Sequence, residues 1–415
     1  MTQTLSPAAL LLMASAVLAI VFEAVGTGMG QRKRIPRHHQ GVVVIVAGLA
    51  VIGLSFAGHG PSPLVAVAIA ACLGGFAVGE GAGLLGERAA LALGLAAATV
   101  TVINADGIVD PIAAVAFAAC AAVVFAGLAM HVDNDAAVEA AAKQVFIGAA
   151  AVILLGIGAL LPGTVGVGSS LVGLALVVGV VPVQGPRLDL AHGASAGVAA
   201  LGGLTLLALG PTLAHLLVGL RTDGPASTVV VAGLCGLPLV ALNQVAIRRV
   251  FGVLVVMQGV LPITAVLVGG DAQTAAVVGV IGVVGLALAS CTLPTLTLPS
   301  SSWEDVSGIG RLAPWRSGLV IFAAAQACGL APTAGFSLRT SLARAADAEH
   351  FWLPVVIFLG AALAALPVVR LALFLFSKTP RHHQVPAARP AAVVAIVVVV
   401  AIAVVGGVTS TWSSS

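Results

Sequence analysis

Charged residues are scarce in this sequence. Only 8% of the 415 residues are Asp, Glu, Lys or Arg, and 60% are hydrophobic. A soluble globular domain carries about 25% charged residues, so the composition argues strongly against a water-soluble protein. Apolar runs recur along the whole chain, and at roughly 20 residues each is long enough to cross a bilayer core of about 30 Å. Gly and Ala dominate these runs, as expected where helices pack closely in lipid.

The sequence also lacks the motifs of metal and cofactor sites. It has no CxxC pair and no Cys/His cluster, and its five cysteines stand singly inside apolar runs. This pattern is typical of small buried hydrophobic residues and not of metal or iron–sulfur ligands. A dinucleotide-binding motif in a βαβ context, a P-loop and a haem-attachment motif are absent as well. We therefore expect no metal, no cofactor bound by this chain and no nucleic-acid partner.

Hydropathy divides the chain into fourteen expected membrane spans. They lie near 7–27, 41–57, 62–79, 89–104, 111–130, 144–162, 169–185, 194–219, 227–245, 250–268, 274–292, 315–336, 351–376 and 391–408. Fourteen of the 18 Lys and Arg residues, including Arg88, Arg187 and Arg248, are assigned to loops after odd-numbered spans. Because basic loops face the cytoplasm, both termini are predicted outside. The chain is expected to be a multi-pass protein of the cell membrane (plasma or inner), in contact with the lipid bilayer.

Proline interrupts two of these spans in a similar way. Pro182 and Pro186 lie in the seventh span, in VVGVVPVQGPRLD, and Pro332 and Gly335 lie in the twelfth, in QACGLAPTAGFSLR. Proline removes a backbone donor and clashes with the preceding turn, so each helix is expected to break. Two breaks five spans apart are typical of inverted five-helix repeats with a polar pathway between them. Two ordinary proline kinks would give the same sequence pattern.

Six stretches carry a resemblance to a known family. They are AVEAAAKQVFIGA at 137–149, VPVQGPRLDLAHGASAGVAA at 181–200, ALNQVAIRRVFGVLVVMQG at 241–259, WEDVSGIGRLAPW at 303–315, GLAPTAGF at 329–336 and ALPVVRLALFLF at 365–376. In these stretches the sequence resembles the antiporter-like membrane subunits of respiratory complex I. It is most similar to subunit N of bacterial NADH–quinone oxidoreductase. The same family includes Mrp-type cation/proton antiporters and membrane-bound hydrogenase subunits.

The resemblance implies an all-α polytopic membrane protein with about fourteen helices and antiporter-like inverted five-helix repeats. It suggests N-terminal membrane helices over 1–110, a proton-translocation core over 111–376, and a basic loop and C-terminal membrane helix over 377–415. The chain would be a non-redox membrane subunit of a complex I-like assembly, without a catalytic site of its own. Quinone and NADH or another donor would be handled by partner subunits. Two alternatives are a stand-alone cation/proton antiporter and a structural scaffold without conduction.

The resemblance also implies a proton relay, from which this sequence departs. Family members usually carry a glutamate in the fifth helix, lysines in the seventh and eighth, and a lysine or glutamate in the twelfth. The corresponding positions here are Ala118 (or Ala119), Val177, Leu207 and Arg339. Arginine does not deprotonate at accessible pH, so Arg339 cannot readily hand on a proton. We expect a degenerate relay with Arg339 in the pathway; alternatively, Arg339 extends to the outer interface beside Arg344 and Asp347.

Four further polar residues are pathway candidates. Gln258 lies where the family often has His or Gln, although an interhelical hydrogen bond would also explain it. His215 could relay a proton or lie at the interface. Asp189 follows the first break and could instead pair with Arg187 or cap the next helix. Arg370 lies where the family usually has an arginine.

Other acidic residues are expected near the ends of spans. Glu23 and Glu80 are interpreted as interfacial groups. Glu139 and Lys143 are four residues apart and are expected to form a helical ion pair on the cytoplasmic face.

Overall fold

The computed structural model describes residues 6–28, 38–81, 84–104, 111–130, 135–219, 223–293, 296, 302–346, 350–377 and 390–412. Within these ranges the chain is helical, and the one β pairing is an isolated bridge between Ala246 and Ser302. The helices are α1 (Pro7–Gly28), α2 (His38–Phe56), α3 (Pro63–Glu80), α4 (Gly86–Asn104), α5 (Pro111–Met130), α6 (Asp135–Leu160), α7 (Thr164–Val178), α8 (Gly185–Gly193), α9 (Ala196–Gly219), α10 (Asp223–Val231), α11 (Leu237–Leu242), α12 (Ile247–Gln258), α13 (Val260–Leu267), α14 (Ala272–Thr292), α15 (Ile309–Leu312), α16 (Pro314–Cys328), α17 (Ala334–Ala345), α18 (Leu353–Leu375) and α19 (Pro390–Trp412). A π-helical turn, Ala232–Gly236, joins α10 to α11.

Ten helical segments of the described chain are long and apolar enough to cross a membrane. Three shorter apolar segments, Pro7–Val21, Thr164–Val178 and Pro390–Val405, accompany them. The prediction of an all-α multi-pass membrane protein is therefore confirmed. The count of fourteen spans, the positions of the termini and the divisions near residues 110 and 376 stay predictions.

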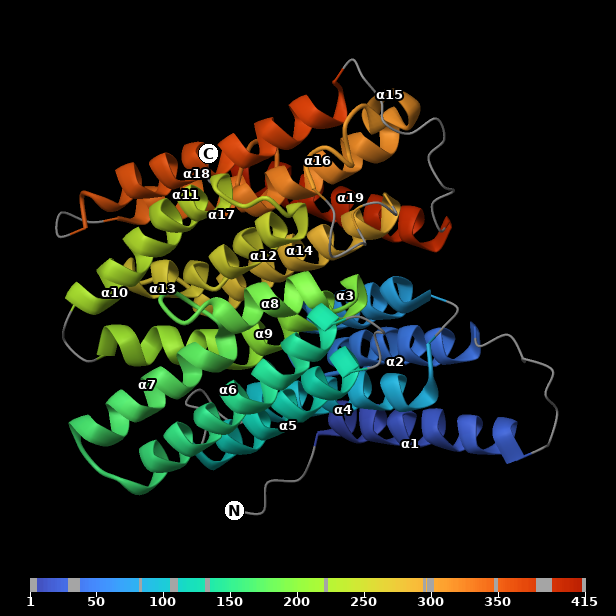
Figure 1. Ribbon diagram of the computed structural model, residues 1–415. Helices are drawn as coiled ribbons and strands as arrows, with labels where there is room; N and C mark the ends of the chain where they lie inside the picture. Colours follow the sequence, from blue (N-terminus) through green and yellow to red (C-terminus); the bar gives the residue numbers. More distant parts are fainter. Residues whose placement is uncertain are drawn as a thin grey trace.

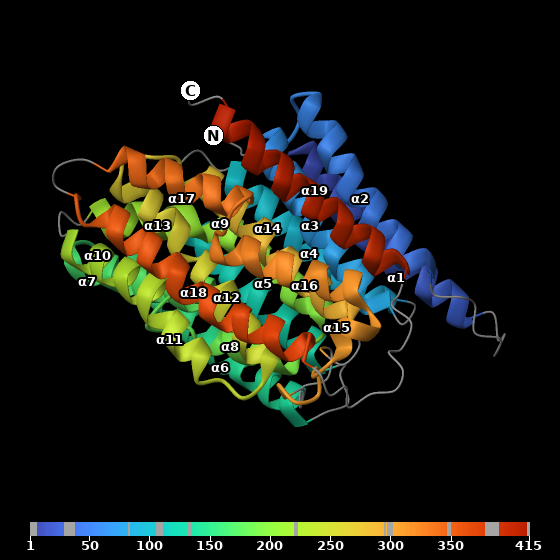
Figure 2. The same cartoon turned by 90° about the horizontal axis from the view of Figure 1, so that it is seen from above.

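The long helices lie side by side and run roughly along one direction (Figure 1). The chain advances across the bundle from α1 to α18, and α19 then returns to pack against α3, α14 and α17 (Figure 2). Helices α3 and α9 approach almost backbone to backbone. They are so close that a Cβ atom at Gly79 would overlap the backbone of Gly197. Small residues permit this close packing in lipid, where the hydrophobic effect does not drive helices together.

The start of α14 illustrates how a local signal sets a helix boundary. Asp271 is an exposed N-cap residue, and its carboxylate accepts hydrogen bonds from the backbone N–H groups of Gln273, at 2.9 Å, and Thr274, at 3.1 Å. We expect Asp271→Ala to lower the free energy of unfolding by about 1 kcal/mol, because two N–H groups lose their acceptor. Denaturant titration in detergent micelles measures this change, and Asp271→Asn, which keeps a capping oxygen, is expected to lose less.

Two segments are interrupted where the sequence predicts breaks. Helix α7 ends at Val178 and α8 begins at Gly185, while α16 ends at Cys328 and α17 begins at Ala334. The bends contain Pro182 and Pro332, each preceded by a cis peptide bond. Pro186 and Gly335 lie beyond the bends, in the first turns of α8 and α17. A proline in the first turn fits a helix, because its missing N–H would have no intrahelical partner there.

Candidate functional site: the two helix bends

The bend after α7 and the bend after α16 have closely similar backbones. The first half-helix ends at a left-handed glycine, Gly179 with φ 76° and Gly329 with φ 72°. The residue after each glycine then donates its N–H back into the half-helix, Val180 to the Ala175 carbonyl and Leu330 to the Ala325 carbonyl. Only glycine adopts this conformation without strain. The two interrupted segments therefore share the same glycine conformation and the same backbone hydrogen bond.

Each bend also holds an arginine that comes from the second half-helix. Arg187 of α8 donates from Nη2 to the carbonyl oxygen of Val177 at 2.6 Å, and Arg339 of α17 donates from Nη2 to that of Ala327 at 3.1 Å. Both acceptors are the last residue but one of the first half-helix. Arg187 is 8% exposed and Arg339 is 2% exposed. The arginines fold back against the glycines so closely that a Cβ atom at Gly179 or Gly329 would overlap them.

Arg187 lies beside two of the positions at which the family resemblance predicts relay residues, Ala118 and Val177. Its guanidinium also donates to the hydroxyl of Thr205 and lies 5.2 Å from the ring centre of Phe125. A small cavity of about 20 Å³ is bordered by Arg187 together with Ala118 and Val177, the expected places of the glutamate and the seventh-helix lysine. Leu207, the expected place of the eighth-helix lysine, is buried in the hydrophobic core. The prediction that Arg187 lies in a loop is wrong.

Arg339 and Gln258 meet at the second bend. Gln258 of α12 donates from Nε2 to the carbonyl of Ala327 at 3.0 Å, the same oxygen that Arg339 contacts, and to that of Leu254 at 2.8 Å. Arg339 contacts Gly335 O at 3.4 Å as well. Arg339 therefore points into the protein and not towards an interface. The structure brings together two of the five pathway candidates.

The other three candidates have different surroundings. His215 is exposed on α9. Asp189 lies 2.9 Å from Lys143, and not in an ion pair with Arg187 as one alternative had it. Lys143 also contacts Glu139 at 2.6 Å, so the predicted helical ion pair is confirmed.

Arg370 of α18 is half-buried at a different place in the bundle. Its Nη1 donates to the carbonyl of Leu242 at 2.8 Å, and its guanidinium lies 4.3 Å from the ring centre of Trp303. These contacts join α18 to the end of α11 and to the loop before α15. Arg370 therefore holds α18 against these two neighbouring segments.

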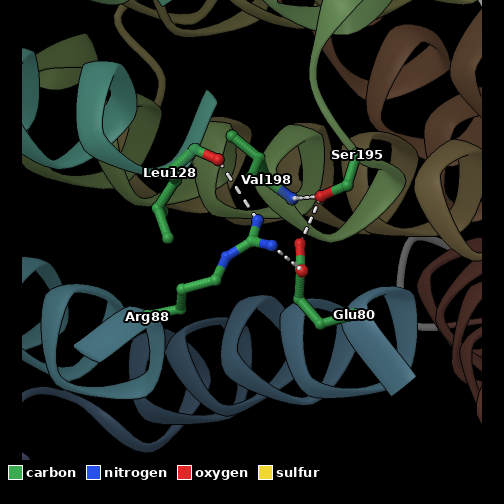
Figure 3. Close-up of polar contacts among 5 residues, drawn as sticks. All are labelled: Glu80, Arg88, Leu128, Ser195 and Val198. Atoms are coloured by element: carbon green, nitrogen blue, oxygen red, sulfur yellow. Dashed lines mark hydrogen bonds and ion pairs between the residues drawn. The ribbon is translucent and has the colours of Figure 1, made fainter. Parts of the chain in front are cut away.

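A buried ion pair was missed by the sequence analysis. Glu80 at the end of α3 and Arg88 at the start of α4 lie 2.7 Å apart, with side chains only 5% and 8% exposed (Figure 3). Ser195 donates its hydroxyl to Glu80, and Arg88 donates to the carbonyl of Leu128 at 3.2 Å. Glu80 is therefore buried within the protein, and Arg88 lies in a helix and not in a loop. The sequence did contain a signal for this pair, because Glu80 and Arg88 stand on either side of one short connection between two spans.

The chemistry of the two bends follows from these contacts. The C-terminal carbonyls of a half-helix carry partial negative charge and attract cations. In both bends an arginine occupies this place, and the expected relay positions Ala118, Val177 and Leu207 carry no ionisable group. In the described part of the chain, no group of three or more His, Cys, Asp or Glu side chains is arranged to hold a metal ion.

Comparison with known proteins gives structural matches only. No family model matches the sequence, and no curated protein matches it. A chain of respiratory complex I from Thermus thermophilus, in a structure with bound aureothin, superposes with a TM-score of 0.74 at 18% identity, over 97% of this chain and 98% of that one. A chain of the Mrp complex from Dietzia sp. DQ12-45-1b gives 0.79 at 16% identity, over 99% and 96%.

A third match lies in the membrane-bound sulfane sulfur reductase, an archaeal respiratory membrane complex. It has a TM-score of 0.73 at 16% identity and covers 97% of this chain and 94% of that one. The three matches span nearly the whole of both chains in each case, so the likeness extends to the complete helical arrangement. The chain has the fold of the antiporter-like membrane subunits of complex I and its relatives, as its sequence motifs predict.

Proposed function

We propose that the chain is a membrane-arm subunit of a complex I-like or related proton-translocating assembly, with a degenerate proton relay. The observation that carries the proposal is the whole-length match to chains of three multi-subunit membrane complexes. The polar bends support it, since broken helices at matched positions are typical of proteins with an ion pathway. Partner subunits would hold the electron-transfer groups and handle quinone and NADH or another donor.

Affinity purification tests this proposal. A tagged full-length chain, extracted from its native membranes in mild detergent, is expected to elute in a stable complex with other antiporter-like subunits and with quinone- or hydrogenase-type subunits. Mass spectrometry of the complex identifies these partners. Elution of the chain alone, together with cation/proton exchange in proteoliposomes that contain only this chain, would contradict the proposal and favour a stand-alone antiporter.

A scaffold without conduction is the second alternative. The lack of ionisable side chains at Ala118, Val177 and Leu207 favours it over a stand-alone antiporter, which needs a titratable coupling site of its own. A scaffold is expected to co-purify in the assembly. It is distinguished by the effect of its removal, which would lower the amount of assembled complex but not the number of protons pumped per electron pair by the remaining complex.

A further inference from the structure

The two half-helix ends of this chain are already occupied by cations. In broken membrane helices, the carbonyls at the C-terminal end of a half-helix coordinate the transported Na⁺ or H⁺. Here the corresponding carbonyls, those of Val177 and Ala327, accept hydrogen bonds from Arg187 and Arg339. Each guanidinium is tethered to the protein and cannot leave, and arginine does not lose its proton. Both sites therefore hold a permanent positive charge.

Within the described residues, these charges have no neighbouring carboxylate. In the described part of the chain, no carboxylate lies within the 4.0 Å ion-pair distance of Arg187 or Arg339. Both guanidiniums are instead held by neutral oxygens, from backbone carbonyls and, for Arg187, the Thr205 hydroxyl. The buried Arg88 shows the contrast, because Glu80 neutralises it at 2.7 Å (Figure 3).

Arg187 also borders two small cavities near the first bend. It borders the cavity beside Ala118 and Val177 and a second cavity of about 20 Å³ beside Leu206 and Gly259. A cavity needs roughly 10–15 Å³ to hold one water molecule. Each cavity thus has room for about one water, and a proton that moved between them would pass the guanidinium.

The end of α12 lies between the first bend and the second. Gln258 contacts the bend of Arg339 through Ala327, and the neighbouring Gly259 lies against Val180 of the first bend. The end of α12 therefore joins the two arginine-filled bends, and its own side chain there is a glutamine, which can order water but does not titrate. Each of the two bends has polar carbonyl groups that could bind an ion, and each already holds a positively charged guanidinium.

We propose that Arg187 and Arg339 form a fixed-charge barrier that keeps protons and metal cations from crossing the membrane through this chain. The inference rests on the proposed function, and it assigns this subunit the task of sealing its position in the assembly without conducting. A fixed arginine excludes cations and protons from a narrow polar pathway. The effect is strong here because the surroundings are apolar and screen the charge poorly.

Passive proton flux tests the barrier. The purified full-length chain is reconstituted in liposomes that contain the pH-sensitive dye pyranine, and a potassium gradient with valinomycin sets an inside-negative potential. The wild-type chain is expected to admit protons no faster than protein-free liposomes do. The double variant Arg187→Gln/Arg339→Gln is expected to admit them at least tenfold faster, because glutamine can still donate to the carbonyls but carries no charge.

A matched control replaces two exposed arginines, in Arg249→Gln/Arg344→Gln, and is expected to leave the flux unchanged. Size-exclusion elution and the thermal midpoint establish that each variant is folded. A wild-type flux above that of protein-free liposomes overturns the proposal without any variant, so a variant that fails to fold does not remove the test. A folded double variant that stays impermeable also overturns it, since the charges would then not be the barrier.

The flux assay tests the barrier and the purification assay tests the proposed function, so either proposal can be contradicted without the other. A chain that joins an assembly but conducts protons as wild type contradicts the barrier and leaves the proposed function intact. A chain that is impermeable but joins no assembly contradicts the proposed function alone. Repeating the flux assay with a sodium gradient and a sodium-sensitive dye extends the test to metal cations, for which the same fold-change is expected.

Discussion

Replacing Glu80 with leucine is expected to destabilise the protein by about 3–5 kcal/mol, the usual cost of leaving one partner of a buried ion pair uncompensated. Glu80 and Arg88 are almost completely buried, and Glu80 also accepts the hydroxyl of Ser195 from the loop before α9. The variant would leave the Arg88 guanidinium in the apolar interior with the carbonyl of Leu128 as an acceptor. Denaturant unfolding in mixed micelles measures the loss.

A double variant separates the charge from the packing. Arg88→Met removes the uncompensated cation while keeping an unbranched side chain, so Glu80→Leu/Arg88→Met is expected to recover most of the lost stability. Replacing a buried ion pair by apolar residues of similar volume is often neutral. The coupling energy from the double-mutant cycle isolates the pair, since the two residues are in direct contact. Additive losses would contradict the assignment of Glu80 and Arg88 as a buried pair.

Ser195→Ala is the matched control for the same site. It removes the hydroxyl that contacts Glu80 but leaves the ion pair in place (Figure 3). The hydroxyl also accepts a hydrogen bond from the backbone N–H of Val198 at 3.3 Å, so the expected loss is about 2 kcal/mol, for two hydrogen bonds. A loss as large as that of Glu80→Leu would indicate that the junction of α3 with α9 depends on the serine and not on the paired charges.

The positions of the two bends could be predicted from the sequence because the cause is local. Proline removes a backbone donor and clashes with the preceding turn whatever surrounds it, so Pro182 and Pro332 mark the interruptions directly. The glycines that complete each bend, Gly179 and Gly329, are harder to recognise, since many glycines in this chain serve close helix packing instead. The prolines also predicted too long an interruption in the first segment, because Pro186 lies in helix α8 and not in the bend.

The arginine in the first bend could not be predicted in the same way. Arg187 stands two residues before Asp189 in a polar stretch, which by composition resembles a cytoplasmic loop. A long arginine side chain can extend outwards or fold back, and only the packing of α8 against α6, α9 and α12 decides between the two. The structure shows Arg187 folded back onto Val177 and Thr205. For Arg339 the alternative was an outward side chain, whereas the structure shows its buried guanidinium donating to the carbonyl of Ala327.

The buried ion pair was missed for a related reason. Hydropathy identifies the apolar centre of a span and assigns charges near its ends to the interface, where most such charges lie. Glu80 and Arg88 are near span ends, but α9 and the end of α5 cover them. That covering depends on contacts between residues 40 and 115 positions apart, which no local pattern in the sequence records.

Gly329→Ala is expected to cost at least about 3 kcal/mol of stability, because two unfavourable effects act at one position. Gly329 has a φ of 72°, which strains any residue with a Cβ atom, and an added Cβ would overlap the guanidinium of Arg339. The arginine would have to leave the carbonyl of Ala327 and lose its main acceptor inside the protein. Gly179→Ala is expected to behave alike through Arg187, since a Cβ there would overlap the arginine stem.

The overlap and the backbone strain can be separated in the same half-helix. Gly318 of α16 has no neighbour within 4 Å of an added Cβ atom, and Gly318→Ala is expected to be neutral or to stabilise by about 0.5–1 kcal/mol, as for a glycine in a helix interior. Shortening the arginine in Gly329→Ala/Arg339→Ala removes the overlap but keeps the strain, so the double variant is expected to be more stable than Gly329→Ala alone. If Gly329→Ala were tolerated as well as Gly318→Ala, the arginine would not be held against the bend, and a fixed positive charge at this position would lose its structural basis.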